Sequence, residues 1–330
     1  MKKVTLFLFV AILFAACTKE VQNLSSKQEN LHEIRFEIPR SRATVEATDF
    51  EKQIKTLEIL IFNKDHQKVI SRTVLEDEIA SGSFSVGVSK KMAGEKCTVY
   101  AIANSPQDES QSEEEIQSRI EEDFDMYQSN YDMVKNRAIR PRGFSMSDKK
   151  EVTLSLEGGV TSVTLSLRRV VARIHSSISI SEKFSKKYPG KITPKSVKIL
   201  GCATKSYIVQ GDSVVAAPLT ASYTQPSKLE DLVWHNLYYS YERNDQTSAT
   251  LPRLIVNCEY DNDGNADTKN DISQMEYVID LNASGIGVIK RNTSYAVEAQ
   301  ITGLQGQELS FTVSVLDWDE ATHEEIEIGA

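Results

Sequence analysis

The chain has 330 residues, of which 40 % are hydrophobic and 26 % are charged, and its formal net charge at pH 7 is −9. This length suits two domains of ordinary size, and the composition is that of a chain that buries packed cores, which excludes an intrinsically disordered protein. The negative charge argues against a nucleic-acid partner, because proteins that bind nucleic acid usually present a basic face.

The amino-terminal segment, residues 1–17, has the layout of a secretory signal peptide. Two lysines are followed by a run over residues 4–14 that is apolar except for Thr5, and two alanines precede Cys17. The run is too short for a stable membrane-spanning helix. The sequence FAAC resembles a bacterial lipobox, so we predict that Cys17 is acylated, for example with palmitate, and holds the protein at a membrane. The alternative is a plain signal peptide followed by an incidental cysteine.

The next segment, residues 18–30, is polar and is expected to be a tether. In LHEIRFEIPR the side chains of Ile34, Phe36 and Ile38 alternate with charged residues, and a period of two predicts a half-buried strand that Pro39 ends.

Short β-rich segments follow in both halves of the chain. Their β-branched and aromatic residues, and the turn residues between them, predict strands. Examples are LEILIF, CTVYAIAN, VTSVTLSL and VVARIHSSISI in the first part, and PRLIVNCEY, MEYVIDL, SYAVEAQI and LSFTVSVLDW in the second. This pattern predicts an all-β protein of two β-sandwich domains in tandem, over residues 31–165 and 166–330.

One segment of the first domain has helical periodicity instead. Ser112 and Glu115 have capping-box spacing, and Ile116, Ile120 and Phe124 recur at helical distance. We predict a helix over about residues 112–128.

The three cysteines after Cys17 lie in or beside apolar, strand-like segments. They form no CxxC pair, and no histidine is spaced to complete a zinc site with them. We interpret Cys97, Cys202 and Cys258 as small buried hydrophobic residues, with a Cys202–Cys258 disulfide as the alternative.

Common catalytic and nucleotide-binding motifs are absent from the sequence. The five histidines are scattered, and HExxH, GxSxG, GxxxxGK[ST] and a GxGxxG after a strand do not occur. We expect that the protein is not an enzyme and has no cofactor.

A polar segment between two predicted strands offers oxygen ligands at alternate positions, as calcium loops do. With Gly264 as the sixth residue of such a loop, the twelfth is Asn270, which cannot act as a bidentate carboxylate. We therefore favour a hairpin loop and keep a calcium site as the weaker alternative, with the ligands Asp261, Asp263, Asn265 and Asp267.

Two further clusters have both a structural and a binding interpretation. The basic residues 135–143 are expected to form a solvated loop, with a patch for an acidic partner as the alternative. The aromatic group of Trp234, Tyr238, Tyr239 and Tyr241 is expected to be core and edge packing, with a sugar-stacking surface as the alternative.

Several segments together resemble the fimbrillins, the type V pilus subunits of Bacteroidales. The lipobox precedes a strand that is followed by Arg and Ala, and the resemblance covers about residues 34–328. LEILIF, VYAIANSP, GFSMS and LSLRRVVARIHSSISI then occur in the family's order, and NTSYAVEAQI and VSVLDWDE close the chain. The resemblance implies two transthyretin-like or Ig-like β-sandwiches in a lipoprotein that is secreted through the periplasm to the outer membrane and the fimbrium at the cell surface.

In this family an Arg-specific protease removes the first strand of the amino-terminal domain, and a donor strand from a neighbouring subunit fills the groove. Such strand addition combines backbone hydrogen bonds with pockets for alternate side chains. The matching positions are the removable strand at Ile34, Phe36 and Ile38, the cleavage site at Arg42 and Ala43 with Arg40 as an alternative, and the donor strand at Ile326 and Ile328.

The resemblance implies a structural pilus subunit that supports adhesion and polymerises with other pilus subunits, as a homo- or hetero-polymer. A host protein or glycan is a further candidate partner. The alternatives are a pilus anchor, which keeps its lipid and its first strand, and a tip adhesin. An alternative from another class is a cell-surface glycan-binding lipoprotein.

Overall fold

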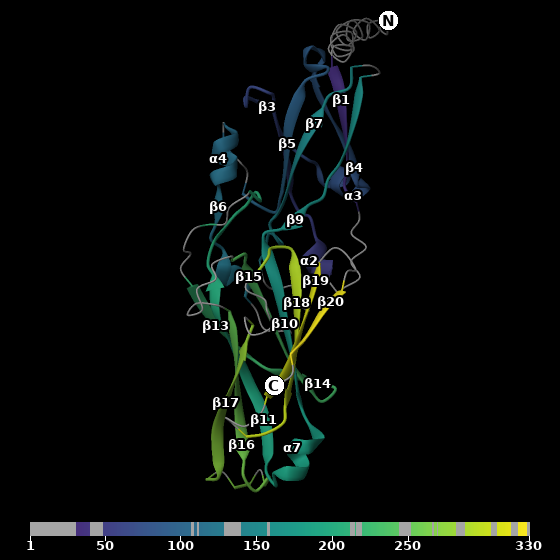
Figure 1. Cartoon of the computed structure of the whole chain (residues 1–330). Helices are drawn as coiled ribbons and strands as arrows, with labels where there is room; N and C mark the ends of the chain where they lie inside the picture. The colour runs from purple at the N-terminus through teal and green to yellow at the C-terminus, as the bar shows by residue number, and fades with distance from the viewer. Residues whose placement is uncertain are drawn as a thin grey trace, which may run out of the picture.

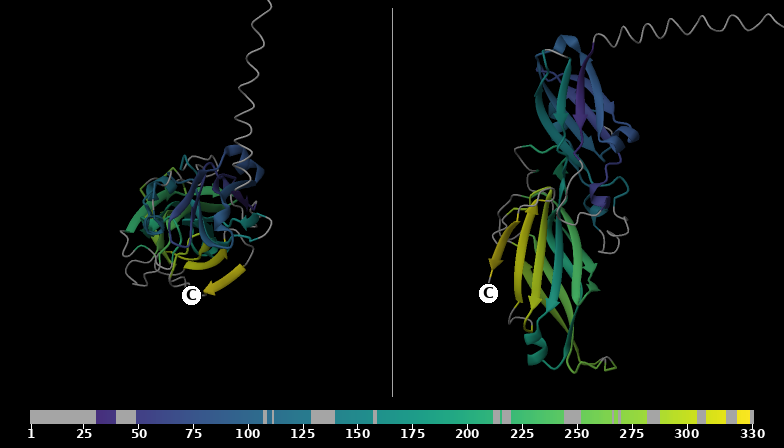
Figure 2. Two further views of the ribbon diagram at one scale, coloured as in Figure 1. Left: turned by 90° about the horizontal axis from the view of Figure 1, so that it is seen from above. Right: turned by 90° about the vertical axis from the view of Figure 1, so that its right-hand side faces the viewer.

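The computed structural model describes residues 31–39, 49–106, 109–110, 112–128, 140–156, 159–211, 215, 220–243, 252–265, 267–268, 270–281, 288–304, 309–317 and 323–328. Two β-rich domains are stacked end to end in an elongated molecule (Figure 1 and Figure 2). The all-β class predicted from the sequence is confirmed. Within the described ranges, every helix is too short or too polar to cross a membrane.

The N-terminal domain contains a three-stranded sheet in the order β4-β1-β8 and a five-stranded sheet in the order β3-β2-β5-β7-β9. Its strands are β1 (Leu31–Glu37), β2 (Leu57–Phe62), β3 (Lys68–Thr73), β4 (Ser83–Ser89), β5 (Lys96–Ala103), β7 (Met146–Thr153), β8 (Val160–Thr164) and β9 (Arg168–Arg169). The short helices are α2 (Asp49–Lys52), α3 (Glu76–Ser81) and η1 (Lys90–Met92). Alternate side chains of both sheets meet in the core, as the period-two patterns require.

The segment predicted as one helix contains three short elements, α4 (Glu113–Ser118), β6 (Ile120–Glu121) and α5 (Phe124–Tyr127). The predicted capping box is present, because Ser112 Oγ accepts from the backbone N–H of Glu115 at 3.2 Å. The single helix is wrong, because the backbone becomes extended at Arg119 and β6 pairs with a distant strand, β12 (Ser206–Tyr207). Local periodicity does not reveal a pairing between segments so far apart in the chain.

The C-terminal domain is built on one long sheet in the order β17-β16-β11-β15-β10-β18-β19-β20, with β13 on β11 and β14 on β15. Because β11 pairs with β16, β13 and β15, the sheet branches there and encloses the core. The elements are β10 (Val171–Ile180), α7 (Glu182–Lys187), β11 (Lys191–Ala203), β13 (Thr220–Pro226), β14 (Lys228–Glu230), β15 (Val233–Tyr241), β16 (Arg253–Asp261), β17 (Ile272–Asp280), β18 (Thr293–Ile301), β19 (Leu309–Asp317) and β20 (His323–Ile328).

Within the described residues Cys97, Cys202 and Cys258 are buried and free, so the interpretation as small hydrophobic residues is confirmed and the Cys202–Cys258 disulfide is wrong. Burial raises the pKa of the Cys202 and Cys258 thiols to about 12 and also raises the pKa of Cys97. The thiolate is the reactive form. In residues 18–330, we therefore expect a thiol-reactive dye to label the native protein far more slowly than the urea-unfolded protein. Rapid labelling of one thiol in the native state would contradict this burial.

A buried polar network joins the inserted segment to the C-terminal domain. Arg140 is 2 % exposed, and its Nη2 lies 3.0 Å from Glu121 Oε2 and 2.8 Å from Asp123 Oδ2. The hydroxyls of Tyr127 and Tyr241 donate to Glu121 Oε1 at 2.6 and 3.1 Å. The expectation of a solvated basic loop is therefore wrong for Arg140, whose guanidinium is held inside the molecule.

A second buried contact ties α2 to the C-terminal domain. Glu51 is fully buried; Tyr239 Oη donates to its carboxylate at 2.6 Å, and Arg173 Nε lies 3.2 Å from it. Within the N-terminal domain, Arg169 Nε of β9 donates to the backbone carbonyl of Glu51 at 2.9 Å. Together with one apolar cluster that includes residues of both domains, these contacts fix how the domains stack.

The aromatic group of the C-terminal domain is part of this interior. Tyr238, Tyr239 and Tyr241 are fully buried, and Trp234 is half-buried and packs against the core. The core interpretation is therefore confirmed for the tyrosines, and the four side chains do not form a sugar-stacking surface.

Candidate functional site

The first strand of the structure, β1, is the central strand of its sheet. It pairs antiparallel with β4 along its whole length, from Leu31 opposite Ser89 to Glu37 opposite Ser83. On its other side it pairs parallel with β8, from Glu33 opposite Val160 to Glu37 opposite Thr164. Loss of an edge strand exposes the hydrogen-bonding edge of one neighbour. Loss of β1 would expose the facing edges of both β4 and β8.

The inward face of β1 carries His32, Ile34 and Phe36. Ile34 and Phe36 are fully buried, and the Phe36 ring stacks on Phe84 of β4 with a centroid distance of 5.0 Å. His32 is 1 % exposed, and its Nε2 lies 2.8 Å from Thr161 Oγ1 of β8. Sequence reasoning missed His32, although counting back by two from Ile34 places it on the same face.

The third predicted apolar position of this strand, Ile38, follows the end of β1. Its side chain is half-buried and packs against the core, and its backbone N–H donates to the carbonyl of Gly82 at 2.8 Å. Burial in the groove therefore comes mainly from Ile34 and Phe36, together with the polar ring of His32.

The residues predicted to be acylated or cleaved are not among those that the structure describes. Cys17, Arg40, Arg42 and Ala43 lie outside the described residues. The two arginines fall in sequence between β1 and α2, and both of these elements are described. Acylation at Cys17 and cleavage after Arg42 or Arg40 stay predictions.

The carboxyl-terminal strand β20 is the outermost strand of the C-terminal sheet, and Figure 2 shows it along the outside of that domain. It pairs antiparallel with β19, with Ile326 opposite Val313 and Ile328 opposite Phe311. Among the described strands β19 is its one partner. An edge strand of this kind is attached by a single ladder of backbone hydrogen bonds.

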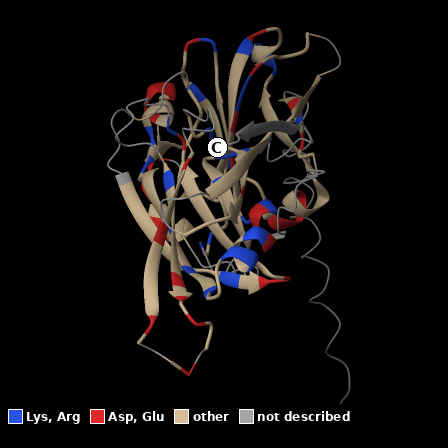
Figure 3. Ribbon diagram, turned by 60° about the horizontal axis from the view of Figure 1, so that its bottom comes forward, with Lys and Arg blue, Asp and Glu red and all other residues tan. Residues whose placement is uncertain are grey.

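The acidic segment proposed as a calcium loop connects β16 to β17, whose ladder runs up to Asp261 opposite Ile272. Figure 3 shows acidic residues at its tip. Carboxylate oxygens of Asp261, Asp263 and Asp271 lie within 4.8 Å of one another, whereas Asp267 is not in this group. Asp263 accepts hydrogen bonds from the backbone N–H of Asn265 and the hydroxyl of Thr268, which lowers its pKa. These bonds are those of the favoured hairpin loop, and calcium binding stays the weaker, untested alternative.

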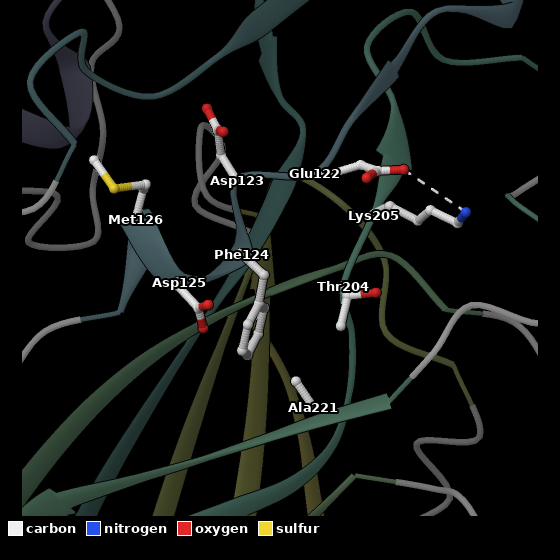
Figure 4. A pocket seen from close by; sticks show the side chains of 8 residues that line it. All are labelled: Glu122, Asp123, Phe124, Asp125, Met126, Thr204, Lys205 and Ala221. Carbon is white, nitrogen blue, oxygen red and sulfur yellow. Dashed lines mark ion pairs between the residues drawn. The ribbon is translucent and has the colours of Figure 1, made fainter.

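A cleft of about 400 Å³ lies beside α5, between the inserted segment and the C-terminal domain. Figure 4 shows Phe124 and Ala221 facing this space from opposite sides. Of its three acidic residues, Asp123 pairs with Arg140 and Glu122 lies 3.7 Å from Lys205 Nζ, whereas Asp125 forms no ion pair with a described residue. A single uncompensated carboxylate is a weak basis for holding a cationic ligand.

Comparison with known proteins places this arrangement in a family. Residues 33–324 match the model of the fimbrillin-A associated anchor proteins Mfa1 and Mfa2. No curated protein matches.

Solved structures with the same fold come from Bacteroides and Porphyromonas species. A fimbrilin from Porphyromonas gingivalis W83 superimposes with a TM-score of 0.62 at 15 % identity, covering 88 % of this chain and 98 % of that one. A protein described as a putative cell adhesion protein, from Bacteroides eggerthii DSM 20697, gives 0.60 at 15 % identity, covering 88 % and 96 %. The tip fimbrial protein Mfa3 of Porphyromonas gingivalis gives 0.57 at 13 % identity, covering 87 % and 100 %. At these identities the structures establish the fold, and the family model, which matches most of the chain, establishes the family. The chain belongs to the fimbrillin-A associated anchor protein family, whose members are fimbrial and adhesion-related subunits.

Proposed function

We propose that the protein is a type V pilus subunit, exported as a lipoprotein through acylation of Cys17, that is activated by proteolysis and assembles by donor-strand exchange. The observation that carries the proposal is the central position of β1 in its sheet. Cleavage after Arg42, or after Arg40, would disconnect β1 from the rest of the chain without cutting any described element. The groove left between β4 and β8 would accept the β20 strand of a neighbouring subunit.

The energetics of the groove favour refilling. Burial of Ile34 and Phe36 contributes roughly 1.5–3 kcal/mol for each side chain, so an empty groove loses about 3–6 kcal/mol of hydrophobic stabilisation. It also leaves the backbone groups of β4 and β8 that faced β1 without strand partners. A donor strand recovers both contributions.

The order of residues in β20 matches that of β1. From amino to carboxyl end, the inward positions of β1 are His32, Ile34 and Phe36, and one alternate set of β20 is Glu324, Ile326 and Ile328. In each case a polar residue precedes two apolar residues at intervals of two. A donor that runs in the direction of β1 therefore places its apolar residues in the pockets of Ile34 and Phe36.

After cleavage, α2 stays with the body of the subunit. Glu51 is held by Tyr239 and Arg173, and its backbone carbonyl is held by Arg169. The new amino terminus would thus lie a few residues before α2, which is held in place. The leaving strand β1 would be retained only by its ladders with β4 and β8 and by its buried side chains.

A pilus anchor is the second candidate, and the description of the matching family, which includes anchor proteins, favours it. An anchor would keep its lipid and its own β1, and would act only as a strand donor. The two candidates differ in whether the bond after Arg42 is cut.

The deciding experiment treats residues 18–330 with an Arg-specific protease, maps the new amino terminus and looks for heat-sensitive oligomer ladders on a gel. For a polymerising subunit we expect cleavage after Arg42 or Arg40 and ladders that disappear when residues 323–330 are deleted. The control R40K/R42K keeps both charges, removes both cleavage sites and should stay monomeric. Cleavage that yields only monomers would contradict the polymerising subunit, and an uncut strand would favour the anchor.

Substitutions on opposite faces of β20 test the donor strand. Ile326→Ser removes an apolar side chain that should enter the groove, so we expect ladders of the cleaved protein to be lost or to dissociate at a lower temperature. Glu327→Ser changes the neighbouring residue, which lies on the other face of the strand, and should leave the ladders intact. Equal effects of the two substitutions on ladder stability would exclude the proposed register.

A further inference from the structure

The two walls of the groove, β4 and β8, depend on β1 for their strand pairing. They lie at the two edges of the three-stranded sheet, and β1 is the one described strand with which each of them pairs. Without β1, neither wall has a ladder of backbone hydrogen bonds to hold it. Whether an empty groove keeps its shape until a donor strand arrives then depends on the other contacts of β4 and β8.

The strand β4 is held by Arg72 of β3, a strand of the five-stranded sheet. Nη1 of Arg72 donates to the backbone carbonyl of Ser85, and the guanidinium lies over the Phe84 ring, 5.8 Å from its centroid. Nη2 donates to Glu78 Oε1 at 2.6 Å, and the other carboxylate oxygen of Glu78 accepts from the backbone N–H of Leu75 at 3.0 Å. These charge-assisted hydrogen bonds fix the guanidinium in the position from which it reaches β4.

The strand β8 is held in a similar way by Lys150 of β7. Nζ of Lys150 donates to the backbone carbonyl of Thr164, the last residue of β8, and to Ser166 Oγ at 3.5 Å. Asp148 of β7 lies 3.7 Å from the same Nζ and accepts from the backbone N–H of Ser166 at 2.6 Å. One cation and one carboxylate of β7 therefore hold the end of β8 and the segment that follows it.

Arg72 and Lys150 have the same relation to the groove. Each belongs to the five-stranded sheet, donates to a main-chain carbonyl of a groove wall and is paired with a carboxylate. The side chains are partly shielded from solvent, with 29 % of Arg72 and 33 % of Lys150 exposed. These bonds are made without any residue of β1, so they can persist after β1 has left.

We propose that Arg72 and Lys150 are positioning residues of the acceptor groove, which hold β4 and β8 in place while the groove is empty and so keep it open to the β20 strand of a second copy of this chain. This inference rests on the proposed strand exchange. In the uncut protein the ladders with β1 hold the same walls, so loss of the two side chains has a small effect there. In the empty groove the ladders are gone, and the same loss lowers the fraction of molecules that can accept a donor strand.

The test measures uptake of a fluorescein-labelled peptide with the sequence of residues 321–330, ATHEEIEIGA, by residues 18–330 after treatment with an Arg-specific protease. Increasing peptide concentrations are incubated with a fixed amount of cleaved protein, and the peptide that co-elutes with the protein in gel filtration is quantified. A lower competent fraction raises the apparent dissociation constant in proportion. For Arg72→Gln with Lys150→Gln we therefore expect a half-saturating concentration raised roughly tenfold or more, with unchanged uptake at saturation. Misfolding of part of the variant would instead lower the uptake at saturation.

A matched variant and the uncut proteins separate this role from a general loss of stability. Lys91→Gln with Lys183→Gln removes the same charge from exposed positions, one of them in η1 directly after β4, and should leave the half-saturating concentration unchanged. Before cleavage, the unfolding temperature of Arg72→Gln with Lys150→Gln should stay within about 5 °C of that of the unsubstituted protein.

Two results would refute the positioning role: a larger fall in the unfolding temperature before cleavage, or equal half-saturating concentrations for the cleaved double variant and the cleaved unsubstituted protein. A different result identifies failure of the proposed function. If the cleaved, unsubstituted protein takes up no peptide, the strand exchange itself is refuted, and the positioning role with it.

Discussion

Replacing Phe36 with alanine is expected to lower the free energy of unfolding of the N-terminal domain by about 3–5 kcal/mol in the uncut protein. The side chain is fully buried, and its ring stacks on Phe84, so the substitution leaves a cavity between the two strands. Both tryptophans belong to the second half of the chain, so tryptophan fluorescence would not report directly on the N-terminal domain. The appropriate measurement is therefore hydrogen exchange of the β4 and β8 amides.

Arg35 provides the matched control for this substitution. It is the neighbouring residue on the solvent face of β1, and its pairing with Glu33 at 3.3 Å is exposed to solvent. Arg35→Ala should change the stability by no more than about 0.5 kcal/mol. A Phe36→Ala protein with unchanged exchange rates in β4 and β8 would mean that β1 does not stabilise this sheet.

Phe36→Ala destabilises the uncut protein, but under the proposed strand exchange it should favour assembly. A strand that binds its groove more weakly leaves more readily after cleavage, so Phe36→Ala should accelerate the appearance of oligomer ladders. The finished ladders should be as heat-resistant as those of the unsubstituted protein, because residue 36 is no longer part of them. Ladders of reduced stability would show that β1 had not been replaced.

Arg140→Ala is expected to destabilise the protein by about 3–5 kcal/mol, because it leaves the buried Glu121 carboxylate without its cation. Glu121 then retains hydroxyl donors, including Tyr127 and Tyr241, which do not balance its charge. Chemical unfolding followed by circular dichroism measures the loss. The control is Arg142→Ala, since Arg142 is exposed, and a change within about 0.5 kcal/mol is expected.

A double variant separates the charge from the packing of this network. Glu121→Gln in the Arg140→Ala background removes the uncompensated carboxylate, so part of the lost stability should return. The alternative outcome is that Glu121→Gln lowers the stability of the Arg140→Ala protein by as much as it lowers that of the unsubstituted protein. The two residues would then act independently, and their ion pair would not contribute to stability.

The alternation of apolar and charged residues predicted β1 correctly, because side chains of a strand point to opposite faces in turn. Its central place in the sheet was not predictable in this way, since β8 lies more than a hundred residues further along the chain and contributes only short backbone pairing. The pattern showed that one face of β1 is buried but contained no information about how many strands flank it.

The charge and hydrophobicity of a residue predicted its burial least well at the domain junction. Arg140 belongs to the basic stretch 135–143, which was expected to be solvated, yet its partners Glu121 and Asp123 come from the inserted segment and bury it. Tyr239 likewise contacts Glu51, which is far away in the sequence. Buried polar networks assemble residues from several elements, so no local window of the sequence contains their pattern.

The distance between the groove and the donor has a consequence for the length of an assembly. The groove would lie in the N-terminal domain and β20 lies on the C-terminal domain, so under the proposed exchange the contact between subunits would be heterologous and would leave one unused strand and one unused groove at the two ends. A molecule that keeps its own β1 would offer a strand but accept none, and it would act as a chain stopper in the sense of polymer chemistry. Under the proposed exchange, the ratio of uncut to cut molecules would set the average number of subunits in a fibre.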